Sequence, residues 1–232
     1  GSTSFIGVNL CLDLISYGYK IDGICSPQNK SKIKKKRIKE LNRNQVKIYK
    51  KNLLDKKSFL NFKSYDVIIN AIGWTNNYNN KKFDNKKIRK YYKIFFNNLE
   101  KYLNKNKPKL FIEIGSSAEY GKSEKKLKEN MNSSPDTPYG LLKANNTLFL
   151  KKISEKLKIP IIVLRVFSIF GFLDKESKLI EYIKNKNKII INNPKLKQDF
   201  ISVNYLNKII INILKKKNII NLIFTIVVLQ LV

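Results

Sequence analysis

Histidine is absent from the 232 residues, and cysteine occurs only as Cys11 and Cys25. Without histidine the chain cannot form a Ser-His-Asp triad, a histidine general base or the usual zinc clusters. Any proton transfer must therefore use Tyr, Lys, Asp or Glu, and we expect no metal site. Two cysteines give no disulfide framework, so the expected compartment is the cytoplasm.

Acidic residues are scarce: 17 Asp and Glu stand against 47 Lys and Arg, a formal net charge of +30. Such an excess raises the affinity for any polyanion. The lysines, however, are scattered through the whole chain with many Asn and Ile, as in "NKNKIIINN". A coding bias towards these residues would give the same pattern. We therefore expect no specific nucleic-acid partner, and a basic nucleic-acid-binding protein is a remote alternative.

Long apolar runs are also missing. The apolar stretch "IINLIFTIVVLQLV" at the C-terminal end is shorter than the ~20 residues that a spanning helix needs, so we expect no membrane partner. The composition, with 43% hydrophobic and 11% aromatic residues, is nevertheless typical of a globular protein.

Short apolar runs alternate with helical patterns along the chain. Strands are expected within residues 19–26, 45–51, 65–73, 109–117 and 160–171. Helices are expected after Gly7 and within residues 31–42, 86–103 and 137–157, the last with Thr137 as N-cap and Pro138 at its first position. This alternation predicts an α/β fold with a doubly wound parallel sheet, which binds ligands at the carboxyl ends of its strands.

A glycine-containing segment, "GSTSFIG", opens the chain. Gly1 would permit a tight turn and Gly7 a close contact between helix and strand, while free N–H groups at the helix start would attract a pyrophosphate. The alternative is a frayed terminus or the remnant of a tag.

A tyrosine and a lysine stand four residues apart in "YGLLK", so Tyr139 and Lys143 share one helix face. An ammonium beside a phenol favours the phenolate and lowers a phenol pKa of ~10, which gives a general acid–base without histidine. A solvated surface pair is the alternative. Ser116 and Ser117 follow a predicted buried strand, where a hydroxyl could hold a substrate oxygen against the Tyr139 phenol.

In this order and spacing, the motifs resemble those of the extended short-chain dehydrogenases/reductases, the NAD-dependent epimerase/dehydratase family that acts on nucleotide sugars. "GSTSFIG" is similar to the family's G-x-x-G-F-I-G, "INAIG" to its N-A-A segment, "GSSAEYG" to S-S-x-x-x-Y-G and "TPYGLLK" to P-Y-x-x-S-K. "LRVFSIFG" resembles L-R-x-F-N-V-Y-G, and "QDFISVNYL" resembles R-D-F-I-H-V-D-D-L. The segment around Asn52 resembles G-D-L-x-D.

The resemblance implies a role for each matching residue. Tyr139 would be the acid–base catalyst at a sugar hydroxyl or ketone, Lys143 would hold the nicotinamide ribose, and Ser116 would hydrogen-bond the reacting oxygen. Hydride would pass between the sugar carbon and the nicotinamide. The resemblance assigns cofactor binding to Gly1, Ser4, Phe5, Ile6, Gly7, Ser26, Asn52, Leu53, Ala71, Ile72, Gly73, Tyr139 and Lys143. It assigns substrate binding to Ser117, Ser168 and Gln198.

Departures from the family pattern narrow the expected reaction. The family's 4,6-dehydratases carry an Asp-Glu pair after the catalytic Ser or Thr, whereas this chain has Ser117 and Ala118, which leaves epimerisation or ketone reduction. The second strand ends in Cys25 and Ser26, without the acidic residue that binds the ribose of NAD. We therefore expect NADP or NAD, with NADP favoured. Gln198 stands where the family's R-D-F segment has arginine. Because such expected substrate contacts are altered, the alternative to an active enzyme is an inactive nucleotide-binding fragment.

The expected domains are a Rossmann-like dinucleotide-binding domain at 1–172, with its first strand missing, and a partial sugar-nucleotide lobe at 173–232. The expected partner is a nucleotide-sugar substrate. The resemblance also implies a homodimer through a helical bundle formed by residues 86–103 and 139–157.

Overall fold

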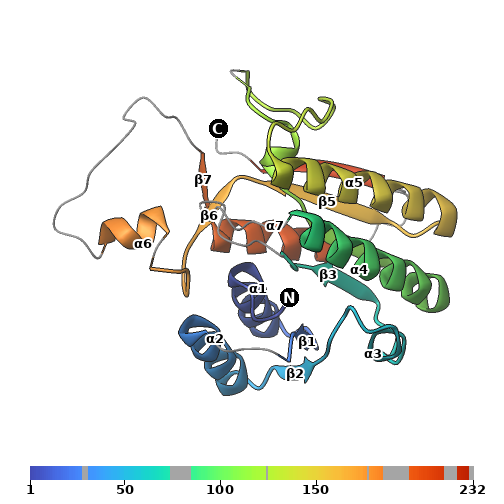
Figure 1. Cartoon of the computed structure of the whole chain (residues 1–232). Helices are drawn as coiled ribbons and strands as arrows, with labels where there is room; N and C mark the ends of the chain where they lie inside the picture. Colours follow the sequence, from blue (N-terminus) through green and yellow to red (C-terminus); the bar gives the residue numbers. More distant parts are fainter. Residues whose placement is uncertain are drawn as a thin grey trace.

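Parallel strands form the centre of the molecule (Figure 1). The computed structural model describes residues 1–27, 31–73, 85–123, 125–176, 178–184, 199–216 and 224–229. Its main sheet has the order β3-β4-β5-β8, formed by Val67–Asn70, Leu110–Ile114, Ile161–Val166 and Phe224–Leu229. A second sheet pairs β1 (Asp22–Cys25) with β2 (Lys47–Lys50), and a third pairs β6 (Ser168–Phe170) with β7 (Phe200–Ser202). Every one of these pairings is parallel.

Helices connect the strands. They are α1 (Phe5–Ser16), α2 (Lys32–Arg43), α3 (Lys56–Leu60), α4 (Asn85–Asn106), α5 (Pro138–Leu157), α6 (Leu179–Lys184) and α7 (Val203–Lys215), with a 3-10 turn, η1, at Ser117–Glu119. The predicted start of α5 is confirmed, because the Thr137 side chain accepts a hydrogen bond from the Gly140 N–H at 3.0 Å and Pro138 is the first helical residue.

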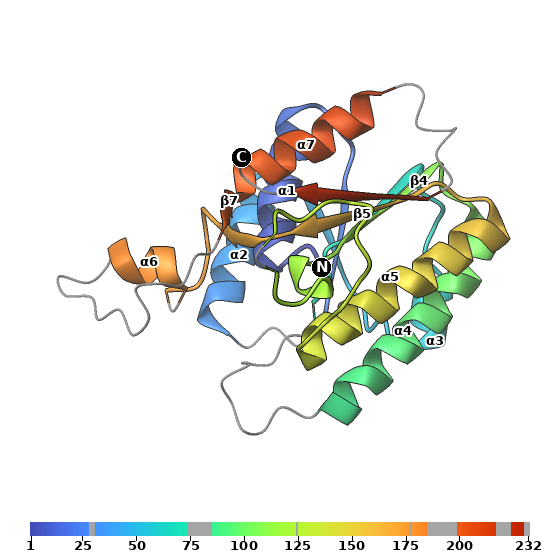
Figure 2. The ribbon, with the colours of Figure 1, turned by 90° about the horizontal axis from the view of Figure 1, so that it is seen from above.

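The helices form two layers, one on each face of the main sheet, as Figure 2 shows. On one face Phe111, Ile161 and Val163 pack against apolar residues of α4 and α5. On the other face Ile112 and Leu164 pack against α1 and α7. Because successive residues of a strand point to opposite faces, β4 and β5 carry apolar residues on both faces and are buried at every position; the charged residue in each is Glu113 and Arg165, respectively. The predicted α/β fold with a parallel sheet is confirmed.

The segments beyond residue 173 lie partly within these layers. Helix α7 packs against α1, and β8 pairs with β5 over six residues, from Ile161 opposite Phe224 to Val166 opposite Leu229. The small β6-β7 sheet and α6 stand to one side of the main sheet (Figure 1). The division of the chain between residues 172 and 173 stays a prediction. Among the described residues we find no helix with the length and apolarity that a bilayer crossing requires.

Candidate active site

The glycine segment forms a tight turn that leads into α1. A Cβ on Gly7 would collide with the Gly1 carbonyl oxygen, and a Cβ on Gly1 would collide with the Ala71 carbonyl oxygen. Both positions therefore require glycine for steric reasons. The turn lies where β3 ends, because Gly1 approaches Ala71 and Ile72 directly.

Ser4 caps helix α1. Its backbone is extended, and its Oγ accepts a hydrogen bond from the Gly7 N–H at 2.9 Å. The first N–H groups of a helix have no intrahelical partner, so those of Phe5 and Ile6 can still bind an anion at this end of α1. The fourth position of the motif G-x-x-G-F-I-G is glycine, whereas this chain has Ser4. The Ser4 side chain thus uses one N–H group of the turn, that of Gly7.

Arg37 holds the turn in place from α2. Its guanidinium donates to the Leu173 carbonyl at 2.8 and 3.1 Å and to the Thr3 carbonyl at 3.3 Å, and only 4% of the residue is exposed. The guanidinium carbon also lies 5.9 Å from the centre of the Phe5 ring. Burial lowers the pKa of Arg37, an effect partly offset by Asp174. This arginine therefore connects the glycine turn to the loop after β6.

Ser116 and Ser117 lie at the carboxyl end of β4, as the sequence predicts. The Ser116 Oγ accepts a hydrogen bond from the Ala118 N–H at 3.2 Å, so its own hydrogen can be donated elsewhere. Ser117 begins the η1 turn and is half-buried.

Helix α5 begins directly against this turn. A Cβ on Gly140 would collide with the Ala118 carbonyl oxygen, so only glycine permits such a close approach. The neighbouring Tyr139, half-buried in the first turn of α5, is thereby brought to the same end of β4 as Ser116. The structure thus gathers the predicted serine and tyrosine at one edge of the sheet.

Lys143 is buried one turn further along α5. Its ammonium donates to the Ile114 carbonyl at 2.7 Å and to the Glu113 carboxylate at 3.3 Å, both on β4. Burial alone would lower the pKa of Lys143, but the Glu113 carboxylate, together with the nearby Tyr92 and Tyr139 phenols, holds that pKa above its usual value. The Glu113 carboxylate also accepts a hydrogen bond from the Asn70 side chain at 2.6 Å. The lysine is therefore a charged, firmly held group beneath Ser116 and Tyr139.

A second buried carboxylate supports the serine turn from behind. Glu119 accepts a hydrogen bond from the Ser116 N–H at 3.0 Å, from the Thr147 hydroxyl at 2.8 Å and from the Arg165 Nε at 2.9 Å. The Arg165 guanidinium carbon lies 4.3 Å from the centre of the Tyr120 ring. This network fixes the position of Ser116 on the β4–η1 connection.

The remaining predicted cofactor residues follow β1, β2 and β3. Ser26 is exposed directly after β1, and the Asn52 side chain accepts a hydrogen bond from the Leu54 N–H at 3.1 Å in the exposed loop after β2. The Leu53 carbonyl accepts a hydrogen bond from Asn98 at 3.3 Å. The three residues after β3 are partly exposed; they are Ala71, Ile72 and Gly73. These positions lie at strand ends, as expected, and their roles in binding stay predictions.

Of the predicted substrate contacts, Ser117 lies in the serine turn and Ser168 is half-buried at the start of β6, two residues after the end of β5. Gln198 lies outside the described residues. In the part of the chain that the structure describes, no group of three or more Cys, Asp and Glu side chains could hold a metal ion.

Sequence reasoning did not select Asn70, Glu113, Glu119 and Arg165. A signal existed for two of them, because a charged residue interrupts each of the apolar runs "KLFIEIG" and "PIIVLRV". A charge inside a buried strand requires a partner, and both residues have one. The sequence does not show which residue the partner is.

The site residues fit a nicotinamide dinucleotide in two places. The glycine turn with the N–H groups of Phe5 and Ile6 suits a pyrophosphate, as at other helix N-termini. The ammonium of Lys143 has three donors, two of which bind β4, so the third can reach a ribose hydroxyl beside Tyr139.

Comparisons with known proteins agree with this geometry. The model of the family described as "NAD dependent epimerase/dehydratase family" matches residues 1–223. An uncharacterized UDP-glucose epimerase, YtcB of Bacillus subtilis strain 168, is 33% identical over 61 residues; this match covers 26% of the chain and only 19% of that relative.

Solved structures share the fold at low sequence identity. A UDP-glucuronic acid 4-epimerase of Bacillus cereus in complex with NAD is 22% identical with a TM-score of 0.79, and the match covers 99% of this chain and 76% of that one. A dTDP-glucose 4,6-dehydratase of Streptomyces venezuelae with NAD bound is 12% identical with a TM-score of 0.82, and the match covers 100% and 74% of the two chains. The family match over residues 1–223 identifies this chain as a member of the NAD-dependent epimerase/dehydratase family, within the extended short-chain dehydrogenases/reductases.

Proposed function

We propose that the chain acts on a nucleotide sugar as a 4-epimerase or 4-keto-sugar reductase that uses a nicotinamide cofactor. The observation that carries this proposal is the contact of Gly140 with the serine turn, which brings Tyr139 and Lys143 to the carboxyl end of β4 beside Ser116. The names of the similar structures, which include UDP-sugar epimerases, support the substrate class.

Each of the three residues has a distinct task in this proposal. The Tyr139 phenol takes a proton from the sugar hydroxyl or returns one to the ketone oxygen. Ser116 donates its hydroxyl hydrogen to the same oxygen and orients it, since its Oγ is already fixed by the Ala118 N–H. Lys143 supplies a fixed positive charge and holds the ribose. A bound nicotinamide supplies the hydride acceptor and donor.

The arrangement of carboxylates favours epimerisation or reduction over dehydration. Elimination of water needs an acid and a base beside the reacting sugar, and the two positions after Ser116 are Ser117 and Ala118. The nearest carboxylate in sequence is Glu119, but it is fully buried and accepts three hydrogen bonds from the protein. It is therefore engaged in holding the serine turn.

The preference for NADP over NAD is part of the proposal. An NAD-binding site commonly has an acidic residue at the end of the second strand for the ribose hydroxyls, and β1 ends here in Cys25 followed by the exposed Ser26. Titration of the chain with NADPH and NADH, followed by nucleotide fluorescence, tests it. Tighter binding of NADPH is expected, equal or reversed affinities contradict the preference, and binding of neither contradicts the proposed function.

Turnover separates the two activities. An epimerase interconverts UDP-glucose and UDP-galactose without net consumption of cofactor, whereas a reductase consumes NADPH with a 4-keto sugar.

The Tyr139→Phe variant should lose a factor of about 100 or more in kcat with little change in cofactor affinity, since general acid–base catalysis contributes that much. Binding without turnover by the unaltered chain would favour the alternative of an inactive nucleotide-binding fragment.

The proposal includes a homodimer through α4 and α5. Helix α5 exposes two leucines seven residues apart on one face, Leu141 at 40% and Leu148 at 57% exposure, which suits a helix–helix contact. Sedimentation should show a dimer that the Leu148→Glu variant converts to a monomer. A monomeric unaltered chain contradicts this part of the proposal.

The cytoplasmic location stays a prediction.

A further inference from the structure

Glu113 occupies a strand position at which an apolar side chain would fit. In the register of β3, β4 and β5 it lies between Asn70 and Val163, and the three side chains point to the face of the sheet that α5 covers. Only 1% of Glu113 is exposed. Burial of a carboxylate is costly, and a buried ion pair adds little stability over an apolar pair of the same volume. The position therefore calls for a reason other than stability.

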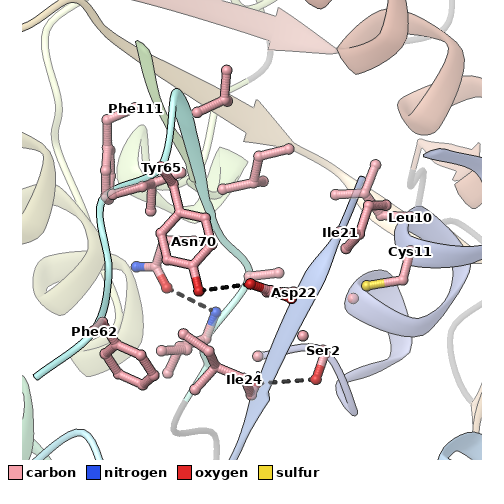
Figure 3. A pocket seen from close by; sticks show the side chains of 18 of the residues that line it. Ser2, Leu10, Cys11, Ile21, Asp22, Ile24, Phe62, Tyr65, Asn70 and Phe111 are labelled. Carbon is pink, nitrogen blue, oxygen red and sulfur yellow. Dashed lines mark hydrogen bonds between the residues drawn. The ribbon is translucent and has the colours of Figure 1, made fainter. Parts of the chain in front are cut away.

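Both carboxylate oxygens of Glu113 accept hydrogen bonds. Oε1 accepts from the Lys143 ammonium at 3.3 Å, and Oε2 accepts from the Asn70 amide at 2.6 Å. The other end of this amide fixes its orientation, because the Asn70 Oδ1 accepts a hydrogen bond from the Ile72 N–H at 3.1 Å (Figure 3). A proton on either oxygen of Glu113 would face one of these donors, so the arrangement favours the ionised form. Burial raises the pKa of Glu113, while Lys143 and Asn70 oppose this effect.

Through these contacts Glu113 joins two parts of the proposed cofactor site. Asn70 holds the backbone of residues 71–73, the segment after β3, by its hydrogen bond from the Ile72 N–H. Lys143 lies on α5, and its remaining donor can reach a ribose hydroxyl. One buried carboxylate thus lies between the strand-end segment and the lysine.

The buried charges at the carboxyl end of β4 cancel in pairs. Glu113 pairs with Lys143 at 3.3 Å, and Glu119 pairs with Arg165 at 2.9 Å. All four side chains are at most 3% exposed, so water screens them poorly. Without the Glu113 carboxylate, these groups would together carry one net positive charge.

The nicotinamide ring is the part of the cofactor whose charge differs between the two redox forms. The ring is a cation when oxidised and is neutral when reduced, whereas the pyrophosphate and the riboses are the same in both forms. Lys143, in the proposed function, holds the ribose that carries this ring. A lone buried ammonium there would repel the oxidised ring, and a carboxylate beside the ammonium cancels this repulsion.

We propose that Glu113 is a specificity-determining residue of the cofactor site, which allows the oxidised nicotinamide to bind at least as tightly as the reduced one. This inference rests on the proposed function and deepens it. A site that accepts the oxidised cofactor suits a reaction that begins with oxidation of the sugar, in which the sugar carbon gives a hydride to the ring and the hydroxyl gives its proton to Tyr139. That is the first half of an epimerisation.

Calorimetric titration at pH 8 with NAD⁺, NADH, NADP⁺ and NADPH measures the affinity for both redox forms of each cofactor. In the unaltered chain the oxidised form should bind at least as tightly as the reduced form. In the Glu113→Gln variant the ratio of the oxidised-form Kd to the reduced-form Kd should rise by about tenfold or more, because an uncancelled unit charge in a poorly screened site changes cation binding by that much. Support of Lys143 alone would change both affinities equally and leave the ratio as it is.

Two further variants separate the charge of Glu113 from its structural role. Glu113→Asp keeps the carboxylate and should keep the ratio of the unaltered chain, even where both affinities fall. The double variant Glu113→Gln/Lys143→Met removes both charges and should restore that ratio, since the net charge of the pair is again zero.

An unchanged ratio in Glu113→Gln, with both forms bound, overturns the inference and leaves the proposed function intact. A double variant that keeps the raised ratio of Glu113→Gln also overturns it. So does a clear preference of the unaltered chain for the reduced form, a measurement that decides the outcome even where Glu113→Gln fails to fold. Binding of neither form by the unaltered chain overturns the proposed function and this inference with it.

Discussion

At the scale of single residues, buried charges decide how the site is held. Glu113 and Lys143 are 1% and 3% exposed in their side chains, and their ion pair joins β4 to α5 beneath the proposed catalytic groups. The desolvation of two buried charges is offset only while both are present. Removing one charge should therefore cost more than removing the pair.

The Glu113→Gln variant should lower the free energy of unfolding by about 3 kcal/mol, because Lys143 would keep a buried charge without its carboxylate. Urea unfolding measures this loss. The double variant Glu113→Gln/Lys143→Met should be destabilised by clearly less than the sum of the two single variants. Additive losses would contradict a direct coupling between the two side chains.

The catalytic candidates were predictable from sequence, whereas their supports were not. Tyr139 and Lys143 stand four residues apart in one motif, but the partner of Lys143 lies 30 residues away on another element. The apolar run "KLFIEIG" around Glu113 predicts a buried strand. Only the packing of α5 on β4 shows that Lys143 neutralises the Glu113 charge. Local spacing predicts residues on one element and not contacts between elements.

At the scale of elements, the contact between α5 and η1 places the site. We expect the Gly140→Ala variant to lose about 1–3 kcal/mol of stability and much of its turnover, since the added methyl group would push the first turn of α5 away from Ala118. Urea unfolding and the epimerase assay measure the two effects.

The same substitution at Gly18 is the matched control. An added Cβ there meets no atom within 4 Å, and the only cost is the positive φ of 82°, about 1 kcal/mol. Gly18→Ala should therefore leave turnover nearly unchanged. Equal losses of turnover in both variants would show that the close approach of Gly140 does not position the site.

Asp22 connects the two sheets at their amino ends. It accepts a hydrogen bond from Tyr65 at 3.0 Å and forms an ion pair with Lys63 at 2.8 Å. Burial alone would raise the pKa of Asp22, but the hydrogen bonds from Lys63 and Tyr65, together with the positive charges of Lys63 and Lys47, hold that pKa below its usual value.

Because the folded-state pKa of Asp22 is lowered, its contribution to stability is complete above its unfolded pKa of ~3.9 and is lost as the pH falls through the folded pKa. Asp22→Asn should be less stable than the unaltered chain at pH 6, and the difference should shrink below pH 4. Urea unfolding at several pH values tests this. A difference that does not change with pH would contradict a role for the Asp22 charge.

Element types were predicted from local pattern, and strand pairing was not. The strands within 65–73 and 109–117 and the N-cap at Thr137 are confirmed. The sequence pattern of "IINLIFTIVVLQLV" did not predict which strand this run would pair with. In the structure six of its residues form β8, which pairs with β5. An apolar run fixes burial, whereas its place in a sheet depends on which edge is open after the other elements have packed.

At the scale of the whole molecule, the dominant feature is the net charge of +30. Ion pairs between described residues include Arg43–Glu40, Lys156–Glu100 and Lys184–Glu181, in which the basic side chain is largely exposed. Exposed pairs contribute little to stability. With so few acidic groups in the chain, repulsion among surface lysines must oppose the compact state.

Added salt should therefore stabilise the protein by screening this repulsion, since the Debye length falls from ~30 Å at 0.01 M to ~8 Å at 0.15 M ionic strength. The urea midpoint should rise as NaCl increases over this range, and urea is used because guanidinium is itself a salt. The double variant Lys36→Glu/Lys39→Glu, at two exposed positions of α2, lowers the net charge and should show a smaller salt effect. A midpoint that falls with salt, or a variant with an unchanged slope, would mean that local ion pairs outweigh the net charge in setting the stability of the fold.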